Sequence, residues 1–121
     1  TFNNLSIKSQ ILAKQGKTAE AEALMQEALP LGTVFQVHGY GRQLIGEGKT
    51  DKALEVFKWN AKNHKGTWPV HYGLARGYSA KGDNKSTIKH LKLALENAPA
   101  QVNRDRVQAN LDKAEKGEGI N

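Results

Sequence analysis

The sequence predicts an all-α protein in which a helix-turn-helix unit repeats about three times and a last helix closes the array. The first observation is a period: Gly48 and Gly82 lie 34 residues apart, which is the spacing of a repeated helical pair. The second is that the surrounding residues repeat too, since His38–Leu44 aligns with Tyr72–Tyr78 at this offset. The third is that helix stop and start signals alternate along the chain.

An earlier copy of the repeat lies upstream. Small and apolar residues follow Gly16–Thr18 in the same order as they follow Gly48–Thr50. These two copies are 32 residues apart, so we expect the connector around Pro30–Gly32 to be two residues shorter. The predicted organisation is one domain over residues 1–121, with repeats at 3–33, 34–67 and 68–99 and a capping helix at 100–115.

Each pair of helices has its own stop and start signals. Gly16, Gly48 and Gly82 can take the left-handed backbone conformation that closes a helix. Side-chain oxygens that can cap the helix that follows belong to Thr18, Thr50 or Asp51, and Asn84. The predicted helices are residues 3–15, 18–29, 34–47, 51–64, 68–81, 84–97 and 100–115.

The last predicted helix has a narrow apolar stripe among many charges. The stripe consists of Val102, Val107, Leu111 and Ala114. This pattern is typical of a terminal helix that covers the core of the preceding repeat on one side and faces water on the other. We expect the glycine-rich tail, residues 117–121, to be frayed.

Small residues recur where helices must approach each other closely. We expect Gly41 and Ala75 to allow the two helices of a repeat to pack tightly. The larger side chains expected to fill the space between repeats are Leu44, Phe57, Tyr78 and Leu91.

Composition excludes several classes of protein. Hydrophobic residues make up 38% and charged residues 25%, which suits an elongated stack with much exposed surface. No cysteine is present, so disulfides, thiolate nucleophiles and cysteine-ligated zinc are excluded. No apolar run reaches the roughly 20 residues that a membrane span needs. The net charge is +6, and the whole excess lies in residues 34–100. Such a balance is compatible with an acidic partner, a nucleic acid or an anionic surface, and the alternative is that it only keeps the protein soluble.

No motif predicts catalysis, a metal site or a cofactor. Gly-Lys-Thr occurs twice, but Ile11 and Gln43 stand where a phosphate-binding loop needs its first glycine. The histidines lack metal-ligand spacing, and no nucleophile has a recognisable base beside it. We therefore expect a protein that is not an enzyme, with no catalytic residues, no metal ligands and no cofactor.

The repeat resembles that of the tetratricopeptide repeat family. The matching residues are Ser9, Leu12, Gly16, Ala21 and Ala28 in the first copy, Gly41, Leu44, Gly48, Ala53 and Phe57 in the second, and Leu74, Ala75, Tyr78, Gly82, Leu91, Ala94 and Pro99 in the third. The resemblance implies a right-handed superhelix whose inner, concave surface is lined by the first helix of each repeat. It also implies a scaffold that binds other proteins.

A closer resemblance concerns five short segments. Lys17–Ala21, Ala28–Thr33, Tyr40–Leu44, Ala75–Ala80 and Gly119–Asn121 are similar to the C-terminal repeat region of certain bacterial proteins, often exported, that carry a domain of unknown function. This resemblance implies a fragment of a periplasmic or otherwise extracytoplasmic protein. The residues themselves leave the compartment open.

Six side chains are expected to line one groove because they occupy matching positions on the first helices. They are Ser6 and Gln10, His38 and Arg42, and Tyr72 and Arg76. Members of each pair are four residues apart, so they project from the same helix face. Arginine presents a planar fork that suits carboxylates, which predicts an acidic or extended segment as the ligand. The alternative is that the two arginines pair with acidic neighbours and that Tyr72 is a packing residue.

Lysines form a second recurring feature. Lys58, Lys62 and Lys65, and then Lys85, Lys89 and Lys92, have a spacing that predicts one outward face on each second helix. Together with Trp59 such faces could bind nucleic acid, and the alternative is a solvated convex surface.

Three functions follow from these features. The first is a protein-interaction module that holds a partner segment in the groove. The second is a structural role, in which the repeats dock on another domain of the same chain or self-associate through the first helix. The third is nucleic-acid binding through the lysines.

Overall fold

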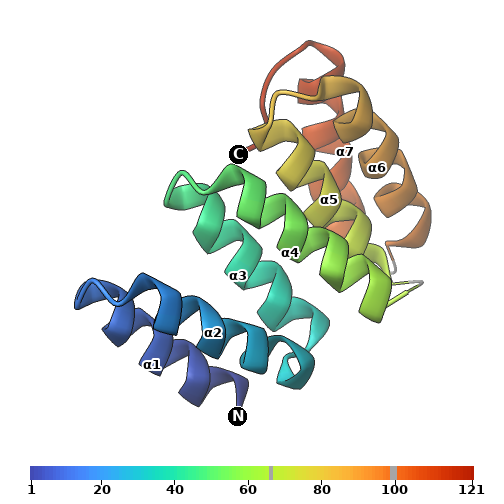
Figure 1. Ribbon diagram of the computed structural model, residues 1–121. Coiled ribbons are helices and arrows are strands. Elements are labelled where there is room, and N and C mark those ends of the chain that lie inside the picture. Colours follow the sequence, from blue (N-terminus) through green and yellow to red (C-terminus); the bar gives the residue numbers. More distant parts are fainter. Residues whose placement is uncertain (66, 99–100) are drawn as a thin grey trace. The chain divides into compact units, whose positions relative to one another are not determined.

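The chain is helical throughout the part that the structure describes. The computed structural model describes residues 1–65, 67–98 and 101–121, the last range with side chains from residue 104 onward, and these ranges hold seven α-helices, one 3-10 turn and no strand (Figure 1). Pro99 and the side chain of Val102, which belong to the predicted repeat and stripe, lie outside the described residues. The prediction of an all-α protein is confirmed.

The helix bounds agree closely with the predicted ones. The helices are α1 (Phe2–Lys14), α2 (Thr18–Ala28), η1 (Leu29–Leu31), α3 (Val34–Gly46), α4 (Thr50–Asn63), α5 (Trp68–Ala80), α6 (Asn84–Asn97) and α7 (Gln101–Glu115). Every end of an α-helix lies within one residue of its predicted position. The periodic pattern and its punctuation therefore predict the elements correctly.

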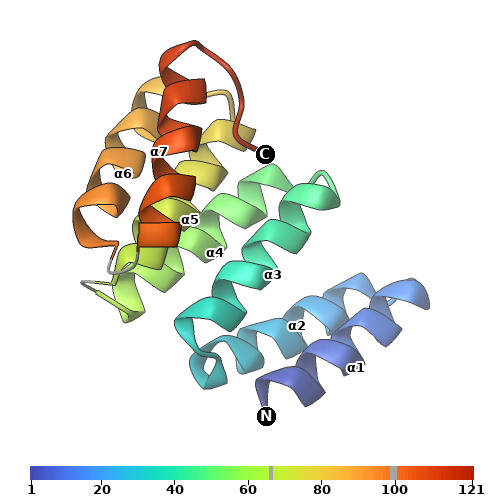
Figure 2. The same cartoon turned by 180° about the vertical axis from the view of Figure 1, so that it is seen from behind.

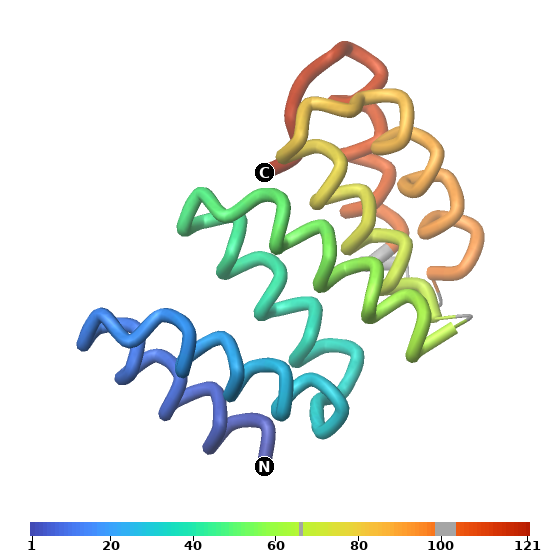
Figure 3. Tube along the Cα trace, viewed as in Figure 1, coloured from blue at the N-terminus to red at the C-terminus, as the bar shows by residue number. Residues whose placement is uncertain are grey.

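Glycine closes α1, α3 and α5 in the predicted way. Gly16, Gly48 and Gly82 have φ values of 80°, 77° and 80°. After each glycine, the next N–H donates to a carbonyl five residues back at 2.9 Å, as from Lys49 to Leu44. This is the Schellman arrangement, which satisfies carbonyls at the end of a helix and reverses the chain tightly (Figure 3).

The predicted caps are wrong. Thr18 and Thr50 are the first residues of α2 and α4, and neither helix has a side-chain cap. The residue before each threonine is a lysine that belongs to the glycine turn. This lysine occupies the N-cap position, and the threonine is the first residue inside the helix, where it does not cap it. At α6 the cap is Asp83 in place of Asn84, and its Oδ1 accepts from the Ser86 N–H at 3.1 Å.

The chain divides into two compact units, residues 1–36 and 37–121. In the first unit α1 and α2 form a helical hairpin with Phe2, Ala21 and Met25 buried. The buried Ser9 hydroxyl donates to the Ala21 carbonyl at 2.7 Å and so joins the two helices. The single domain expected over residues 1–121 stays a prediction.

The core of the second unit lies among α5, α6, α7 and the C-terminal tail (Figure 2). Its buried members are Tyr72, Ala75, Leu91, Ala94, Val107, Leu111, Ala114 and Ile120. Residues from α7 supply three of these, which agrees with its expected role of covering the third repeat.

The prediction of a frayed tail is wrong. Gly117 has a φ of 80° and turns the chain back after α7. Ile120 is buried in the core, and its N–H donates to the Ser79 hydroxyl at 3.1 Å. Burying one isoleucine side chain stabilises by about 1.5–3 kcal/mol, which offsets part of the conformational entropy lost when a short tail becomes ordered.

Phe57 of α4 packs against glycines of α3 and α5. A Cβ built on Gly41 of α3 would be 2.5 Å from the Phe57 ring, and one on Gly73 of α5 would be 2.6 Å from it. Gly77 of α5 is also close, at 3.1 Å. The prediction that Gly41 permits close packing is confirmed, and Phe57 is the side chain that needs the space.

We expect Gly41→Ala to destabilise the protein by about 1–3 kcal/mol, because the added methyl group would overlap a ring that is itself buried. Gly39→Ala is the matched control on the same helix, with no atom within 4 Å of the added Cβ. That change should stabilise by about 0.5–1 kcal/mol, since alanine is the better helix former. Urea unfolding of both variants checks the pair, and equal effects would contradict the packing.

Candidate functional site: an arginine pocket in the second unit

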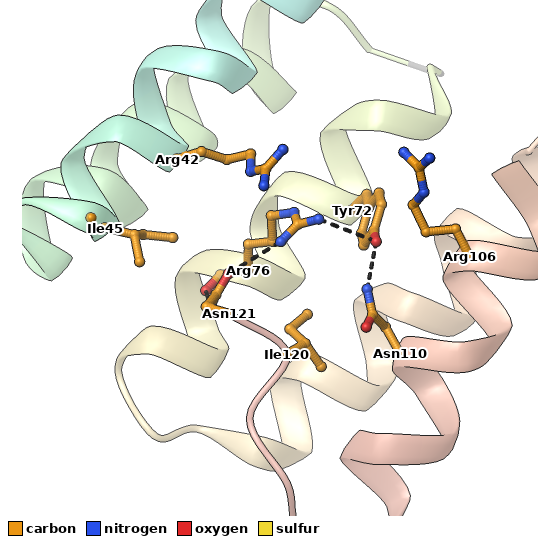
Figure 4. A pocket seen from close by; sticks show the side chains of 9 residues that line it. Arg42, Ile45, Tyr72, Arg76, Arg106, Asn110, Ile120 and Asn121 are labelled. Carbon is orange, nitrogen blue, oxygen red and sulfur yellow. Dashed lines mark hydrogen bonds between the residues drawn. The ribbon is translucent and has the colours of Figure 1, made fainter.

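A pocket of about 410 Å³ opens on the second unit. It is lined by Arg42, Ile45 and Gly46 of α3, Tyr72 and Arg76 of α5, Arg106 and Asn110 of α7, and Ile120 and Asn121 of the tail. Figure 4 shows the three arginines reaching this pocket from three different helices. The site is therefore assembled from segments that are distant in the sequence.

Arg76 occupies the centre of the pocket lining and is only 9% exposed. Its guanidinium carbon lies over the Tyr72 ring, 4.6 Å from the ring centre. The guanidinium also donates to the Tyr72 hydroxyl at 3.3 Å and to Asn121 Oδ1 at 3.4 Å. Asn121 Nδ2 in turn donates to the Arg76 carbonyl at 2.7 Å (Figure 4). The Arg76 Nε–H is buried and donates to no described residue.

No Asp or Glu side chain of the described residues neutralises this cluster. Among the described residues, no Asp or Glu side chain lies within ion-pair distance of Arg42, Arg76 or Arg106. Burial lowers the pKa of Arg76, and the positive charges of Arg42 and Arg106 lower it further, against the raising effect of Tyr72. A guanidinium nevertheless stays protonated, so the pocket holds a buried cation that no described Asp or Glu side chain neutralises.

Tyr72 is both a core residue and part of the pocket. Its ring is buried and lies 6.0 Å from that of Trp68. Its hydroxyl accepts hydrogen bonds from Arg76 and from Asn110 Nδ2 (Figure 4). The packing interpretation of Tyr72 is therefore correct for the ring, while the hydroxyl faces the charged group.

His38 does not line the pocket. Its ring contacts those of Phe57 at 5.5 Å and Tyr72 at 6.2 Å, and its Nδ1 has no described hydrogen-bond partner. Burial, followed by the charges of Arg76 and Arg42, lowers the pKa of His38 to about 4. His38 is thus neutral at physiological pH and adds no charge to the site.

Three of the six residues predicted for one groove line the pocket. The pocket brings Arg42, Tyr72 and Arg76 together, as expected. Ser6 and Gln10 lie on α1 in the first unit, where Gln10 is exposed and Ser6 half-buried. The pocket is lined by residues of the second unit alone.

The sequence interpretation missed Arg106 and Asn110, although the period contains them. His38, Tyr72 and Arg106 are spaced by 34 residues, and so are Arg42, Arg76 and Asn110. The last helix is predicted only as a cap, so the sequence interpretation does not extend the 34-residue period to Arg106 and Asn110. Extending the repeat by one further step would have placed both residues beside Tyr72 and Arg76.

The lysine surfaces differ in part from the prediction. Lys85, Lys89 and Lys92 are all exposed on α6. The other trio does not share one helix, because α4 ends at Asn63 and Lys65 lies in the turn that follows. Lys58 Nζ lies 5.9 Å from the centre of the Tyr78 ring.

Two histidines form a second polar cluster in this unit. His71 Nδ1 and His90 Nδ1 are 3.4 Å apart, and the His90 ring stacks on Tyr78 at 5.5 Å. Burial lowers the pKa of both, that of His90 to about 4.

Within the described ranges, no three His, Asp or Glu side chains are grouped to hold a metal ion. None of the described helices is long and apolar enough to cross a membrane.

Comparison with known proteins gives partial similarities only. No family model and no solved structure matches the chain. It is 32% identical over 87 residues to the 4-hydroxy-3-methylbut-2-en-1-yl diphosphate synthase (flavodoxin) of Corynebacterium efficiens, covering 71% of this chain and 23% of the synthase. The synthase of the same name from Arthrobacter sp. (strain FB24) is 33% identical over 82 residues, 67% of this chain and 21% of the synthase. The chain spans less than a quarter of the length of these proteins.

Proposed function

We propose that this chain is a tetratricopeptide-like, non-enzymatic interaction module that binds an acidic segment of a partner protein in its arginine pocket. The carrying observation is that Arg76 is buried, that no described Asp or Glu side chain pairs with it, and that Arg42 and Arg106 line the same pocket. Removing a charge from water costs several kcal/mol unless a partner of opposite charge repays it. An incoming anion supplies that partner.

The repeat supports the architectural part of the proposal. The helical pairs α3–α4 and α5–α6, the glycine turns at Gly48 and Gly82, and the pocket residues Arg42, Arg76 and Asn110 follow the same 34-residue period. Successive pairs stacked at a fixed offset bring equivalent side chains of neighbouring first helices side by side. Arg42 and Arg76 are equivalent in this sense, and both line the pocket.

The test is charge reversal at the two exposed arginines, Arg42→Glu with Arg106→Glu. Binding of a fluorescently labelled poly-glutamate peptide should weaken by at least about tenfold, because two of the three positive charges at the site are inverted. Circular dichroism should show unchanged helicity, since both side chains are exposed.

The matched control is Lys89→Glu with Lys92→Glu, which changes the net charge equally on the exposed face of α6. This variant should bind poly-glutamate nearly as well as the unaltered chain. Equal losses in both double variants would show that the peptide senses net charge only, and the pocket would be rejected as its site. Binding of a labelled oligonucleotide lost only with the lysine changes would favour the nucleic-acid function instead.

A second candidate, self-association through the first helix, rests on its exposed apolar side chains. Ile7 and Ile11 are 56% and 52% exposed and lie four residues apart on α1. Exposed apolar area of this kind favours contact with a second surface. Sedimentation should then show a dimer that Ile7→Lys disrupts, and a monomer at high concentration would dismiss this candidate.

A further inference from the structure

The anion that fits the arginine pocket best carries two charges. We propose that the pocket binds a phosphoryl dianion, presented as a phosphomonoester on the partner segment, an inference that rests on the proposed function and names its ligand. The charge of the pocket, its hydrogen-bond donors and its size are the observations that support this group.

The charge of the pocket exceeds what one carboxylate can neutralise. Arg42, Arg76 and Arg106 contribute three positive charges, and no described Asp or Glu side chain pairs with them. His38 adds none because it is neutral. One carboxylate would leave two uncompensated charges around a buried guanidinium, whereas a phosphoryl dianion leaves one.

The lining presents donors that lack acceptors. Arg76 uses its two terminal nitrogens on Tyr72 and Asn121, which leaves the buried Nε–H unpaired. The Tyr72 hydroxyl already accepts two hydrogen bonds, so its own proton is available to an acceptor. Among the described residues, Arg42 and Arg106 make no hydrogen bond. The three terminal oxygens of a phosphoryl group can accept from the Tyr72 hydroxyl and from the guanidinium groups of Arg42 and Arg106, and two carboxylate oxygens satisfy fewer of these donors.

The size of the pocket indicates that the phosphoryl group is attached to something larger. Its volume of about 410 Å³ leaves room beyond a single tetrahedral anion. Ile45 and Ile120 add apolar surface to the lining next to the arginines. An apolar stem, such as the side chain that bears a phosphate, can contact these two residues while the charged end meets the guanidinium groups.

The experiment titrates the intact chain with inorganic phosphate, with acetate, and with blocked Ala-Xaa-Ala peptides in which Xaa is phosphoserine, glutamate or serine. The readout is the ¹⁵Nε–¹H resonance of Arg76, the buried donor without a partner. We expect phosphate and the phosphoserine peptide to shift this resonance, with the phosphoserine peptide binding at least about tenfold more tightly than the glutamate peptide. The serine peptide and acetate should have little effect.

Protonation and substitution supply two further checks. Binding should weaken below about pH 6, where the dianion takes up a proton, while the weak binding of glutamate should not follow that step. Arg42→Ala with Arg106→Ala should reduce phosphoserine affinity by at least about tenfold, and Lys89→Ala with Lys92→Ala should leave it within about twofold.

Each outcome decides a separate point. Equal affinity for phosphoserine and glutamate peptides would overturn the dianion and leave the proposed binding of acidic segments intact. A response to inorganic phosphate without any response to a peptide would support the dianion site and overturn the proposed partner segment. An Arg76 resonance that no phosphorylated compound shifts would overturn the dianion.

Discussion

Phe57→Ala should cost about 3–5 kcal/mol of the free energy of unfolding, because it empties the space between three helices. The Phe57 ring is only 1% exposed and reaches from α4 to glycines on both α3 and α5. These glycines have no side chain that could fill the cavity left behind. Since the free energy of unfolding of a small protein is about 5–15 kcal/mol, the variant would keep only part of its stability.

Phe35→Ala is the matched control, because it removes the same side chain from a position that is 63% exposed. Its effect should stay within about 0.5 kcal/mol. Chemical denaturation followed by circular dichroism measures both variants under the same conditions. Similar midpoints for the two would contradict the central position of Phe57 in the second unit.

Stability should fall as the pH drops from about 6.5 to about 4, and His38 should account for much of that fall. The unfolded chain takes up a proton at His38 near its ordinary pKa, while burial and two arginines lower the pKa of the folded state to about 4. The unfolded state therefore binds more protons in this window, and unfolding becomes easier as the pH decreases. The lowered pKa of His38 corresponds to a loss of about 3 kcal/mol in the free energy of unfolding once the pH has fallen through both pKa values.

The measurement is the free energy of unfolding at several pH values for the unaltered chain and for His38→Gln, which cannot take up the proton. The difference between the two proteins should change across this window by about 3 kcal/mol, and carboxylates common to both cancel. His90 should act with the same sign, since burial lowers its pKa as well. Parallel curves for the two proteins would show that His38 titrates normally.

Part of the candidate site was predictable from the sequence. The rest was not, for a physical reason. Equivalent positions of the repeat pointed to Arg42, Tyr72 and Arg76, and the pocket contains all three. Those positions share a helix face or a period, which are local properties of sequence spacing. His38 satisfies the same spacing, yet its ring packs against Phe57 and does not line the pocket. Spacing alone does not distinguish these two outcomes.

The sequence by itself determined the helices and their ends. Glycine at 16, 48 and 82 permits the left-handed turn that stops a helix, and this depends on the residue and its immediate neighbours. Apolar periodicity then selects the face that each helix buries. Both are short-range effects, which explains why the predicted bounds agree with the observed ones.

Only the tertiary structure decided which cations are buried and what surrounds them. α7 and the tail bring Arg106 and Asn121 next to Arg76, more than 25 residues away along the chain. The same contacts order a tail that its glycines alone would leave frayed. The burial of Arg76, with no described Asp or Glu side chain beside it, arises from long-range packing, because it depends on every segment that excludes water from the site.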